Sequence, residues 1–260
     1  MVIVLSIDNK KAGEVKLPDA FSQQLNEKVL KRAYLAEESE NFQLKYPDPL
    51  AGMRKSAELT KRRRSYKTTY GGNTRTPKKT LQHVGSHFSY VGAVAPNTVG
   101  GREAHPPKAE RRLVKKINKQ ERQLAIRIGI AGSAKKELVS KFHKIDGLNE
   151  LPLVLEDKIN VLEKTKDALK VLAGVGLSVE LDRVMKRSIR AGKGKLRGRK
   201  YKRKLGIVLV TTDDSKLKRA VSNLNVMVKK VNSLSVSDVS QAGKPGRLVV
   251  WTKSALEGLK

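Results

Sequence analysis

The feature that most constrains this fold is the stretch of residues 45–110, in which apolar side chains follow no helical or strand period. It contains six of the nine prolines and seven of the 20 glycines. A structureless stretch of this length is rare inside a compact domain, and it is usually functional or disordered. We therefore expect residues 45–110 to form a long extended loop inserted into a domain made of residues 1–44 and 111–260.

Aromatic side chains distinguish this inserted stretch from an ordinary linker. Five of the eleven aromatics in the chain lie here, at Tyr46, Tyr66, Tyr70, Phe88 and Tyr90. Flexible linkers are poor in aromatic residues, whereas aromatics interleaved with Arg and Lys can stack on unpaired bases while the cations contact phosphates. This composition favours an RNA-contacting loop over the alternative of a linker with scattered aromatics.

The positive charge of the chain is concentrated in two segments. The chain has 55 Lys and Arg against 25 Asp and Glu, a formal net charge of +30. Residues 45–110 carry 13 cations and four acids, and residues 183–204 carry 12 cations and no acid. A local excess of this kind is the electrostatic footprint of a protein that binds a polyanion. A membrane surface is the competing partner, but no basic stretch here has the bulky apolar face that membrane-binding helices carry.

The second basic segment, from Arg183 to Lys204, contains three spaced glycines. Gly192, Gly194 and Gly198 allow the backbone to approach a phosphate chain closely, and the cations between them supply the opposite charge. A nuclear-localisation signal is the alternative for any short basic cluster. Because twelve cations with spaced glycines exceed what a signal needs, we expect an RNA-binding loop.

The expected RNA contacts are the cations, histidines and aromatics of the two segments. In the inserted stretch they are Arg54, Lys55, Lys61, Arg62, Arg63, Arg64, Tyr66, Lys67, Tyr70, Arg75, Lys78, Lys79, His83, His87, Phe88, Tyr90, Arg102, His105 and Lys108. In the second segment they are Arg187, Arg190, Lys193, Lys195, Arg197, Arg199, Lys200, Tyr201, Lys202, Arg203 and Lys204.

The rest of the chain has the pattern of an α/β domain. Short apolar runs predict buried strands at residues 2–5, 153–155, 207–210, 226–231 and 248–251. Helical stripes run through Leu25, Val29, Ala33 and Ala36, and through Leu113, Ile117, Leu124 and Ile128.

Helix ends are suggested at Pro106–Pro107, at Thr165 and Gly174, and at the capping-box spacing of Ser254 and Glu257. Strands that alternate with helices predict a Rossmann-like, mostly parallel central sheet flanked by helices, with the long loop inserted into it.

A search for catalytic chemistry finds no site. The sequence has neither a phosphate-binding P-loop nor a nucleophile elbow, and the turn after the first strand, Ser6–Gly13, has no glycine-rich loop. Asp213 and Asp214 could hold Mg²⁺ but are better explained, with Ser215, as caps of the next helix. His83 and His87 have zinc-like spacing, yet Gly85 between them and the lack of a carboxylate favour RNA contacts.

Other features bound the class of protein further. With no cysteine, disulfides and iron–sulfur clusters are excluded. The apolar N-terminus is too short for a membrane span and lacks a cleavage site, so we expect a soluble, cytoplasmic protein. Trp251 lies in an apolar strand and is expected in the core.

Several motifs together resemble the archaeal form of the ribosomal protein L-four family, in order over essentially the whole chain. They include Tyr46–Leu50, Lys61–Lys67, Thr74–Lys78, Val99–Pro107, Leu153–Asp157, Ile189–Tyr201, Ala220–Leu224 and Pro245–Thr252. The long C-terminal extension of eukaryotic relatives is missing, which favours an archaeal source.

The resemblance implies a structural role in the large ribosomal subunit without enzymatic activity. Its partners would be the large-subunit rRNA, neighbouring ribosomal proteins and the nascent peptide, with no membrane, no DNA and no cofactor apart from Mg²⁺ held by the rRNA. It also implies that the inserted loop reaches the peptide exit tunnel and helps to form its constriction. By match, the tunnel-side tip would be Gly71, Gly72, Asn73, Thr74, Arg75 and Thr76.

Two other classes of protein compete with this one. An RNA-modifying enzyme with a basic substrate arm would need a glycine-rich cofactor loop after a strand, and the sequence has none. A DNA-packaging protein would use a symmetric dimer or a minor-groove arm without interleaved aromatics.

Overall fold

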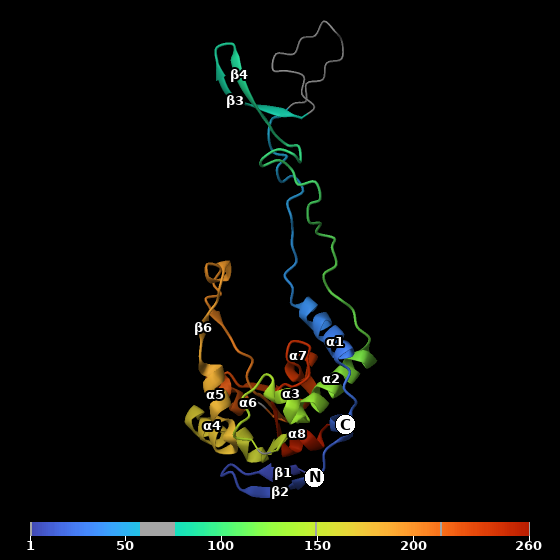
Figure 1. Cartoon of the computed structure of the whole chain (residues 1–260), viewed down its shortest axis with the longest axis vertical. Coiled ribbons are helices and arrows are strands. Elements are labelled where there is room, and N and C mark those ends of the chain that lie inside the picture. Colours follow the sequence, from blue (N-terminus) through green and yellow to red (C-terminus); the bar gives the residue numbers. More distant parts are fainter. Residues whose placement is uncertain (1, 58–75, 149, 214, 260) are drawn as a thin grey trace. The chain divides into compact units, whose positions relative to one another are not determined.

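The computed structural model describes residues 2–57, 76–148, 150–213 and 215–259, and many of its elements are labelled in Figure 1. The chain divides into two compact units. Residues 1–41 and 114–260 form the first, here called the α/β unit, and residues 42–113 form the second, here called the inserted unit. Each unit is described by itself below.

The α/β unit is built on a six-stranded sheet in the order β2-β1-β5-β10-β8-β9. All neighbours are parallel except β1 and β2, which are antiparallel, so the prediction of a mostly parallel α/β sheet is confirmed. In sheet order the strands are β2 (Lys11–Val15), β1 (Val2–Leu5), β5 (Leu153–Leu155), β10 (Val249–Thr252), β8 (Val208–Thr211) and β9 (Met227–Lys230).

The edge strand β2 corrects the prediction that Ser6–Gly13 is only a turn. Val2 pairs with Val15 and Ile3 with Glu14, so the chain turns back after β1 and adds a strand to the sheet. Four of its five residues are exposed. Because an exposed edge strand needs no apolar run, the residues Lys11–Val15 carried no hydrophobic signal.

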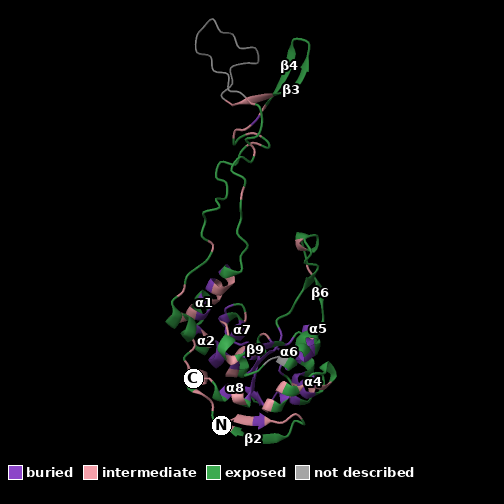
Figure 2. Cartoon of the chain, turned by 180° about the vertical axis from the view of Figure 1, so that it is seen from behind, coloured by how far each residue is buried: buried purple, intermediate pink, exposed green. Residues whose placement is uncertain are grey.

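Side chains that alternate along the strands divide the core into two layers. One layer contains Leu153, Leu155, Leu209 and Val250 together with side chains of α4, α5 and α6. The other contains Val154, Val208, Val249 and Trp251, packed against Ile130 of α2 and Val239 of α7. This is the two-residue period of a sheet covered on both faces. Trp251 is fully buried, as predicted, and Figure 2 shows the buried residues gathered in this unit.

Helices cover both faces of the sheet, as the sequence predicted. Helix α1 packs outside α2 and α7 through a small cluster that includes Leu30, Ala33 and Ile128. The helices are α1 (Glu27–Glu40), α2 (Lys119–Ala134), α3 (Lys136–Ser140), α4 (Thr165–Leu172), α5 (Ser178–Met185), α6 (Ser215–Val221), α7 (Val236–Val239) and α8 (Lys253–Glu257). Short 3-10 helices span Asp19–Ser22, Asp157–Val161, Lys193–Lys195, Ser222–Leu224 and Val231–Ser233, and a π-helical turn spans Ala173–Leu177.

Three of the predicted helix ends are wrong. Helix α2 begins at Lys119, so Pro106–Pro107 does not start it and Leu113 and Ile117 precede it. Helix α4 spans Thr165–Leu172, the extent that was predicted, but Thr165 makes no capping hydrogen bond. A π-helical turn carries the chain beyond Gly174 to Gly176, whose φ is +96°.

Ser254 is not a helix cap either. Helix α8 has Thr252 at its N-cap, and the backbone N–H and the hydroxyl of Ser254 both donate to Asp157 Oδ1, at 3.0 and 2.5 Å. The capping box of this chain is instead at α7, where Ser235 and Asp238 satisfy each other's backbone groups. Helix α6 begins at Ser215, but Asp214 lies outside the described residues, so its expected capping role stays a prediction.

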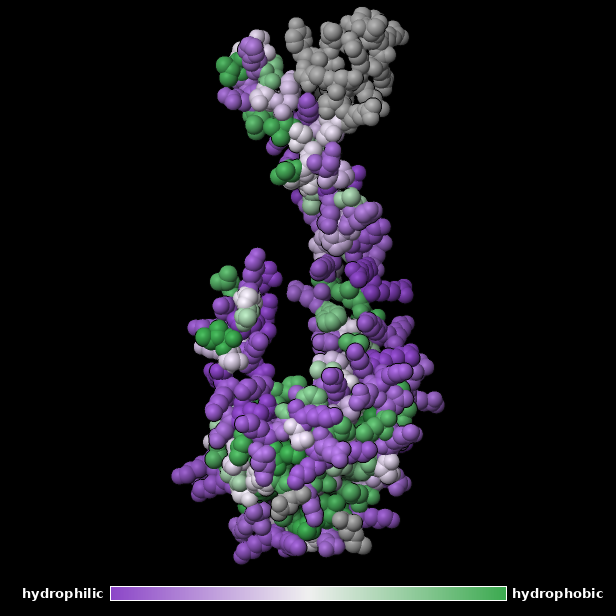
Figure 3. Space-filling model, in the orientation of Figure 1, coloured by the Kyte–Doolittle hydropathy of each residue, from purple (hydrophilic) through white to green (hydrophobic). Residues whose placement is uncertain are grey.

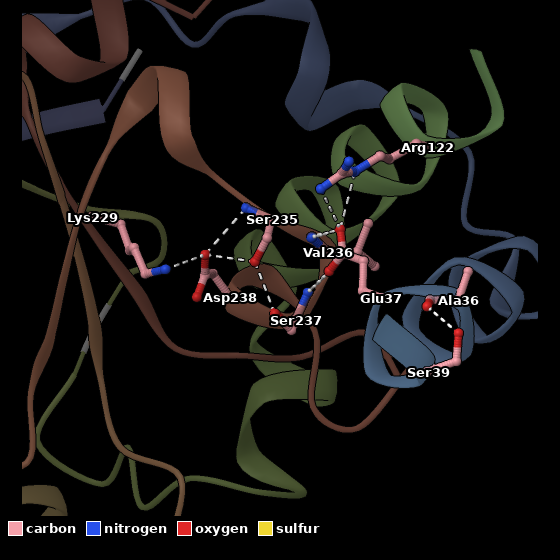
Figure 4. A network of polar contacts seen from close by, with 9 residues as sticks. All are labelled: Ala36, Glu37, Ser39, Arg122, Lys229, Ser235, Val236, Ser237 and Asp238. Carbon is pink, nitrogen blue, oxygen red and sulfur yellow. Dashed lines mark hydrogen bonds and ion pairs between the residues drawn. The ribbon is translucent and has the colours of Figure 1, made fainter. Parts of the chain in front are cut away.

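Helix α7 is also fixed by Glu37 of α1 (Figure 4). The carboxylate of Glu37 accepts hydrogen bonds from the backbone N–H groups of Val236 and Ser237, at 3.1 and 2.9 Å, and from Arg122 Nε at 3.2 Å. Asp238 in turn accepts from Lys229 Nζ at 3.1 Å. These contacts connect α1, α2, α7 and the edge strand β9.

The inserted unit contains secondary structure that the sequence did not indicate. Strands β3 (Lys78–Val84) and β4 (His87–Gly92) form an antiparallel hairpin, with a register shift between Thr80 and Gln82. The prediction of a structureless stretch is therefore wrong for residues 78–92. No period was visible because nearly every residue of both strands is exposed, so neither face is selected to be apolar.

Candidate nucleic-acid interface

The second basic segment forms a projecting hairpin, here called the basic arm and defined as residues 186–204. Its strands are β6 (Ser188–Ile189) and β7 (Tyr201–Lys202), which pair antiparallel in the α/β unit. Arg190 extends the ladder, because its N–H donates to the Lys200 carbonyl at 2.8 Å and its Nε to the Arg199 carbonyl at 3.1 Å. A 3-10 turn at Lys193–Lys195 closes the tip.

Two glycines of the basic arm have a backbone conformation that other residues avoid. Gly192 has a φ of +77° and Gly198 a φ of +76°, and a Cβ at either position would meet no atom within 4 Å. The need for glycine here is therefore conformational, since positive φ is disfavoured for residues with a side chain. These glycines let the chain bend at the tip without help from packing.

The cations of the basic arm have no carboxylate partner among the described residues. Within the described part of the chain, no ion pair includes any Lys or Arg from 186 to 204. Every residue of the arm is exposed except Arg190 and Gly194, which are half-buried. Figure 3 shows the arm as mostly hydrophilic with a few hydrophobic side chains. Leu196 and Ile189 are the arm's exposed large aliphatic residues. Eleven such cations on 19 residues repel one another, so the arm is suited to a polyanion.

Tyr201 is the aromatic side chain of the basic arm. Lys200 Nζ lies 5.6 Å and Arg187 Cζ lies 6.0 Å from the centroid of its ring. Both distances are within reach of cation–π attraction. The half-exposed ring thus combines a stacking surface with two neighbouring charges, as expected for a contact with RNA.

A buried carboxylate holds the base of the basic arm. Glu180 of α5 accepts hydrogen bonds from Arg183 Nε and Nη2, both at 2.7 Å, and from the Lys144 backbone N–H at 2.9 Å, and its Oε1 lies 2.6 Å from His143 Nδ1. Arg183 Nη2 also donates to the Leu205 carbonyl at 2.9 Å. Arg183 and Leu205 lie just outside the two ends of the arm, so this cluster holds both of its strands.

The pKa of Glu180 reflects this arrangement. Burial by itself raises the pKa of this carboxyl, but the hydrogen bonds from Arg183, His143 and Lys144 outweigh it and lower the pKa to about 2. The carboxylate is therefore charged throughout the physiological range, and the salt bridge at the base of the arm persists.

The β3–β4 hairpin of the inserted unit presents aromatic side chains. The ring centroids of His83 and Phe88 are 4.4 Å apart, and those of Phe88 and Tyr90 are 6.0 Å apart with nearly parallel planes. Phe88 and Tyr90 are exposed. Because His83 and His87 lie on opposite strands of a hairpin, the helical spacing considered for zinc does not exist, and the described residues contain no cluster of three or more His, Asp or Glu.

The other residues of the inserted unit that were predicted to contact RNA lie in different local environments. Arg54 donates to Asp48 at 3.0 Å, and Lys55 donates to the Gly100 carbonyl at 2.9 Å, so both stabilise a local turn structure. Gly52 approaches the backbone of Gly101 so closely that a Cβ would lie 2.4 Å from its carbonyl oxygen. Lys78 and Lys79 are half-buried at the start of β3, and Thr76 precedes them. The remaining described cations and histidine, Arg102, His105 and Lys108, are exposed.

The other expected contacts lie outside the described residues. They are Lys61, Arg62, Arg63, Arg64, Tyr66, Lys67, Tyr70, Gly71, Gly72, Asn73, Thr74 and Arg75. Their roles, and that of Thr76 at the tunnel-side tip, stay predictions.

The residues that support the arm were not predicted from the sequence. Glu180 and Arg183 have i, i+3 spacing on a helix, a weak signal that most often marks an exposed pair. His143 carried no signal at all, because its partner lies 37 positions away. No helix in the described part of the chain is long and apolar enough to cross a membrane.

The chain combines an α/β domain with an exposed basic arm that contains no acidic residue. These features define the class of basic proteins whose charge is suited to a polyanion. The family model described as "Ribosomal protein L4/L1 family" matches residues 15–260. The chain therefore belongs to the ribosomal protein L4/L1 family.

Similar curated proteins are archaeal and share one name, "Large ribosomal subunit protein uL4". The protein of Nanoarchaeum equitans is 38% identical over 263 residues, covering 100% of this chain and 97% of its own length. The protein of Methanococcus vannielii is 37% identical over 262 residues, covering 100% and 98%. That of Archaeoglobus fulgidus is 36% identical over 262 residues, covering 98% and 96%. The resemblance noted in the motifs is thus confirmed over the full length.

Proposed function

We propose that this chain is a structural constituent of the large ribosomal subunit, where it binds 23S-type rRNA and catalyses no reaction. The observation that carries the proposal is the full-length similarity to archaeal proteins named as large-subunit proteins. The basic arm supports it, because exposed cations on an ordered hairpin release condensed counterions when they meet phosphates.

The two basic regions contribute differently to this function. The basic arm contacts phosphates through its cations and stacks Tyr201 on a base, while the β3–β4 hairpin offers Phe88 and Tyr90 for stacking. We further propose that the inserted stretch reaches the peptide exit tunnel and lies near the nascent peptide and neighbouring ribosomal proteins. On this proposal the protein acts on cytoplasmic ribosomes, with Mg²⁺ present only as part of the rRNA.

Cosedimentation tests the main proposal. On a sucrose gradient at moderate salt, the tagged full-length chain should migrate with the large subunit. A chain that remains at the top of the gradient while the subunit stays intact would rule the proposal out.

The tunnel position needs its own experiment. A photo-crosslinking residue placed at position 72, the expected tip, should react with a radiolabelled nascent chain in stalled ribosomes. The same residue at position 166, on the exposed face of α4, should not react. Equal labelling from both positions, or none from position 72, would contradict the tunnel assignment.

A further inference from the structure

A pocket of about 570 Å³ lies at the foot of the basic arm in the α/β unit. Its lining combines the last residues of the arm, Arg203 and Lys204, with Lys218 of α6, Lys229 of the edge strand β9 and Arg247 before β10. We call it the arm-foot pocket. Its volume is in the range of pockets that hold small organic ligands, and it exceeds what a simple inorganic ion fills.

Arg247 gives the arm-foot pocket a buried, charged side chain. Its side chain is only 2% exposed, and its Nε–H has no hydrogen-bond partner among the described residues. Its Nη1 makes only a long contact of 3.4 Å to Gln241 within the same part of the chain. Burial lowers the pKa of Arg247 to about 10, although Asp238 and Glu180 nearby act in the opposite direction. A buried guanidinium with donors unused is costly unless an acceptor reaches it.

The charges around the arm-foot pocket favour an anion as that acceptor. No carboxylate is among its lining residues. Lys229 is paired with Asp238 at 3.1 Å, but no ion pair within the described part of the chain includes Arg203, Lys204 or Lys218. With Asp238 counted, the five cations still leave an excess of positive charge around Arg247.

The walls of the arm-foot pocket are held in place before any ligand arrives. Leu205, next to Lys204, is fixed by its hydrogen bond from Arg183, which Glu180 holds in turn. Gly206 approaches the turn before β9 so closely that a Cβ would lie 2.5 Å from the Asn225 carbonyl oxygen. Preorganised walls reduce the ordering entropy that a ligand must overcome.

We propose that the arm-foot pocket binds a backbone phosphate of the RNA strand that contacts the basic arm, with the buried guanidinium group of Arg247 in its lining and Arg203, Lys204 and Lys218 as surrounding cations. The proposal rests on the proposed function and deepens it by assigning a phosphate site beyond the arm itself. Two of the pocket's cations belong to the arm, so an RNA strand that follows the arm reaches the pocket without a break. The planar guanidinium suits phosphate oxygens in geometry as well as in charge.

The first test uses inorganic phosphate as a probe of the free, full-length protein. Because Arg247 Nε–H is buried, it should give a separate side-chain signal in nitrogen–proton NMR spectra, which Arg247→Lys would remove and so identify. Addition of inorganic phosphate should shift this signal with saturation, and Lys218→Gln should weaken the response severalfold. A signal that does not move would overturn the proposal, because the pocket would then hold only water.

The second test asks whether RNA is the occupant, and it compares two neighbours on α6. Lys218 lines the pocket, whereas Arg219 is equally exposed but lies outside its lining. Lys218→Gln should reduce the log–log salt dependence of rRNA binding by about 0.7 to 0.9, the contribution of one phosphate contact. Arg219→Gln should leave that slope unchanged.

Failure of the arm-foot pocket can be distinguished from failure of the proposed function. If Lys218→Gln and Arg219→Gln give equal log–log salt slopes while the wild-type protein still binds rRNA, the proposal of a phosphate site in the arm-foot pocket is wrong. The proposed function is unaffected by that result. The pocket proposal also fails if Lys218→Gln weakens inorganic phosphate but leaves RNA binding unaltered, since the occupant would then be a free anion. Wild-type protein that binds rRNA without salt dependence would count against the proposed function itself. Since Lys218 is exposed, its substitution leaves the fold intact even if Arg247→Lys does not fold.

Discussion

The β3–β4 hairpin and the basic arm are both exposed two-stranded elements, but they differ in what orders them. The β3–β4 hairpin has six register pairs and a row of neighbouring aromatic rings, and it carries two lysines in 15 residues. The basic arm has two register pairs and eleven cations in 19 residues. The first is ordered along its own length, whereas the second depends on the Glu180 cluster at its base.

This difference predicts two modes of RNA contact in one chain. Cations act through counterion release and therefore lose strength as salt rises. Stacking on an aromatic ring is largely independent of salt and contributes energy at each base. Substitutions in the two elements should accordingly be distinguishable by salt dependence and not only by affinity.

The largest expected effect is on the charge of the basic arm. Substitution of Gln for Arg187, Lys193, Lys195, Arg197 and Lys200 should reduce the log–log salt slope of rRNA binding by about 3.5 to 4.5, if each cation contacts one phosphate. The measurement is filter binding of the full-length protein over a range of salt concentrations. A control with the same loss of charge replaces five exposed lysines elsewhere, Lys10, Lys11, Lys16, Lys166 and Lys170. If the control lowers the slope equally, the arm has no special role.

The base of the arm should be the next most sensitive place. Glu180→Gln leaves Arg183 and the buried His143 without their anion, and removal of one partner from a buried ion pair costs about 3–5 kcal/mol. Guanidinium denaturation should show this loss as a lower midpoint. Glu163→Gln, which breaks the exposed pair with Lys216, should leave the midpoint nearly unchanged. Two variants of equal stability would mean that the cluster does not hold the arm.

Acid provides an independent check on Glu180. Its pKa is lowered from 4.5 to about 2 in the folded protein, so the unfolded chain binds the proton more readily. The resulting stabilisation, about 3 kcal/mol, is complete above the unfolded pKa and is lost as the pH falls from 4.5 towards 2. The wild-type midpoint should therefore fall more steeply over this range than that of Glu180→Gln. Parallel pH profiles would contradict the assignment.

A strand could be predicted from the sequence only where burial selects a pattern of apolar residues. Strands β5, β8 and β10 were predicted because both of their faces are covered, which selects continuous apolar runs. Strands β2, β3 and β4 were missed because they are exposed and carry no such selection.

The same limit applies to the candidate site. The cations of the basic arm could be found from composition, because local charge needs no tertiary information. The support of the arm and the arm-foot pocket could not, because Glu180 and Arg247 are of residue types that are mostly exposed, and His143 is of a type that is buried only in some proteins. Only the fold shows that these three are buried, and only tertiary contacts between distant segments explain why.

A smaller effect is expected from the aromatic hairpin. Phe88→Leu keeps an apolar side chain but removes the ring that lies between His83 and Tyr90. If Phe88 stacks on a base, rRNA affinity should fall by about 1–3 kcal/mol, roughly 5- to 150-fold, with the salt slope unchanged. Val91→Ala on the same strand serves as the control, since it is also exposed but not aromatic. A change in slope, or equal losses for the two variants, would refute the stacking mode.

The smallest effect concerns the turns, and it compares the two hairpins most directly. Gly198 in the basic arm and Gly85 in the β3–β4 turn both have positive φ, +76° and +58°, with open space around them. Alanine at either position should therefore cost about the same, roughly 1 kcal/mol, from conformation alone. Asparagine, which tolerates this backbone region, should cost less at both.

The two alanine substitutions should differ in how far along the strands the local destabilisation extends. With only two register pairs, the arm cannot confine a strained turn, so Gly198→Ala should speed amide hydrogen exchange from Ser188 to Lys202. With six pairs, the β3–β4 hairpin should confine the effect of Gly85→Ala to the turn. Faster exchange along the whole of β3 and β4 would show that the longer hairpin is no better ordered by its own pairing than the arm, and the distinction between them would fail.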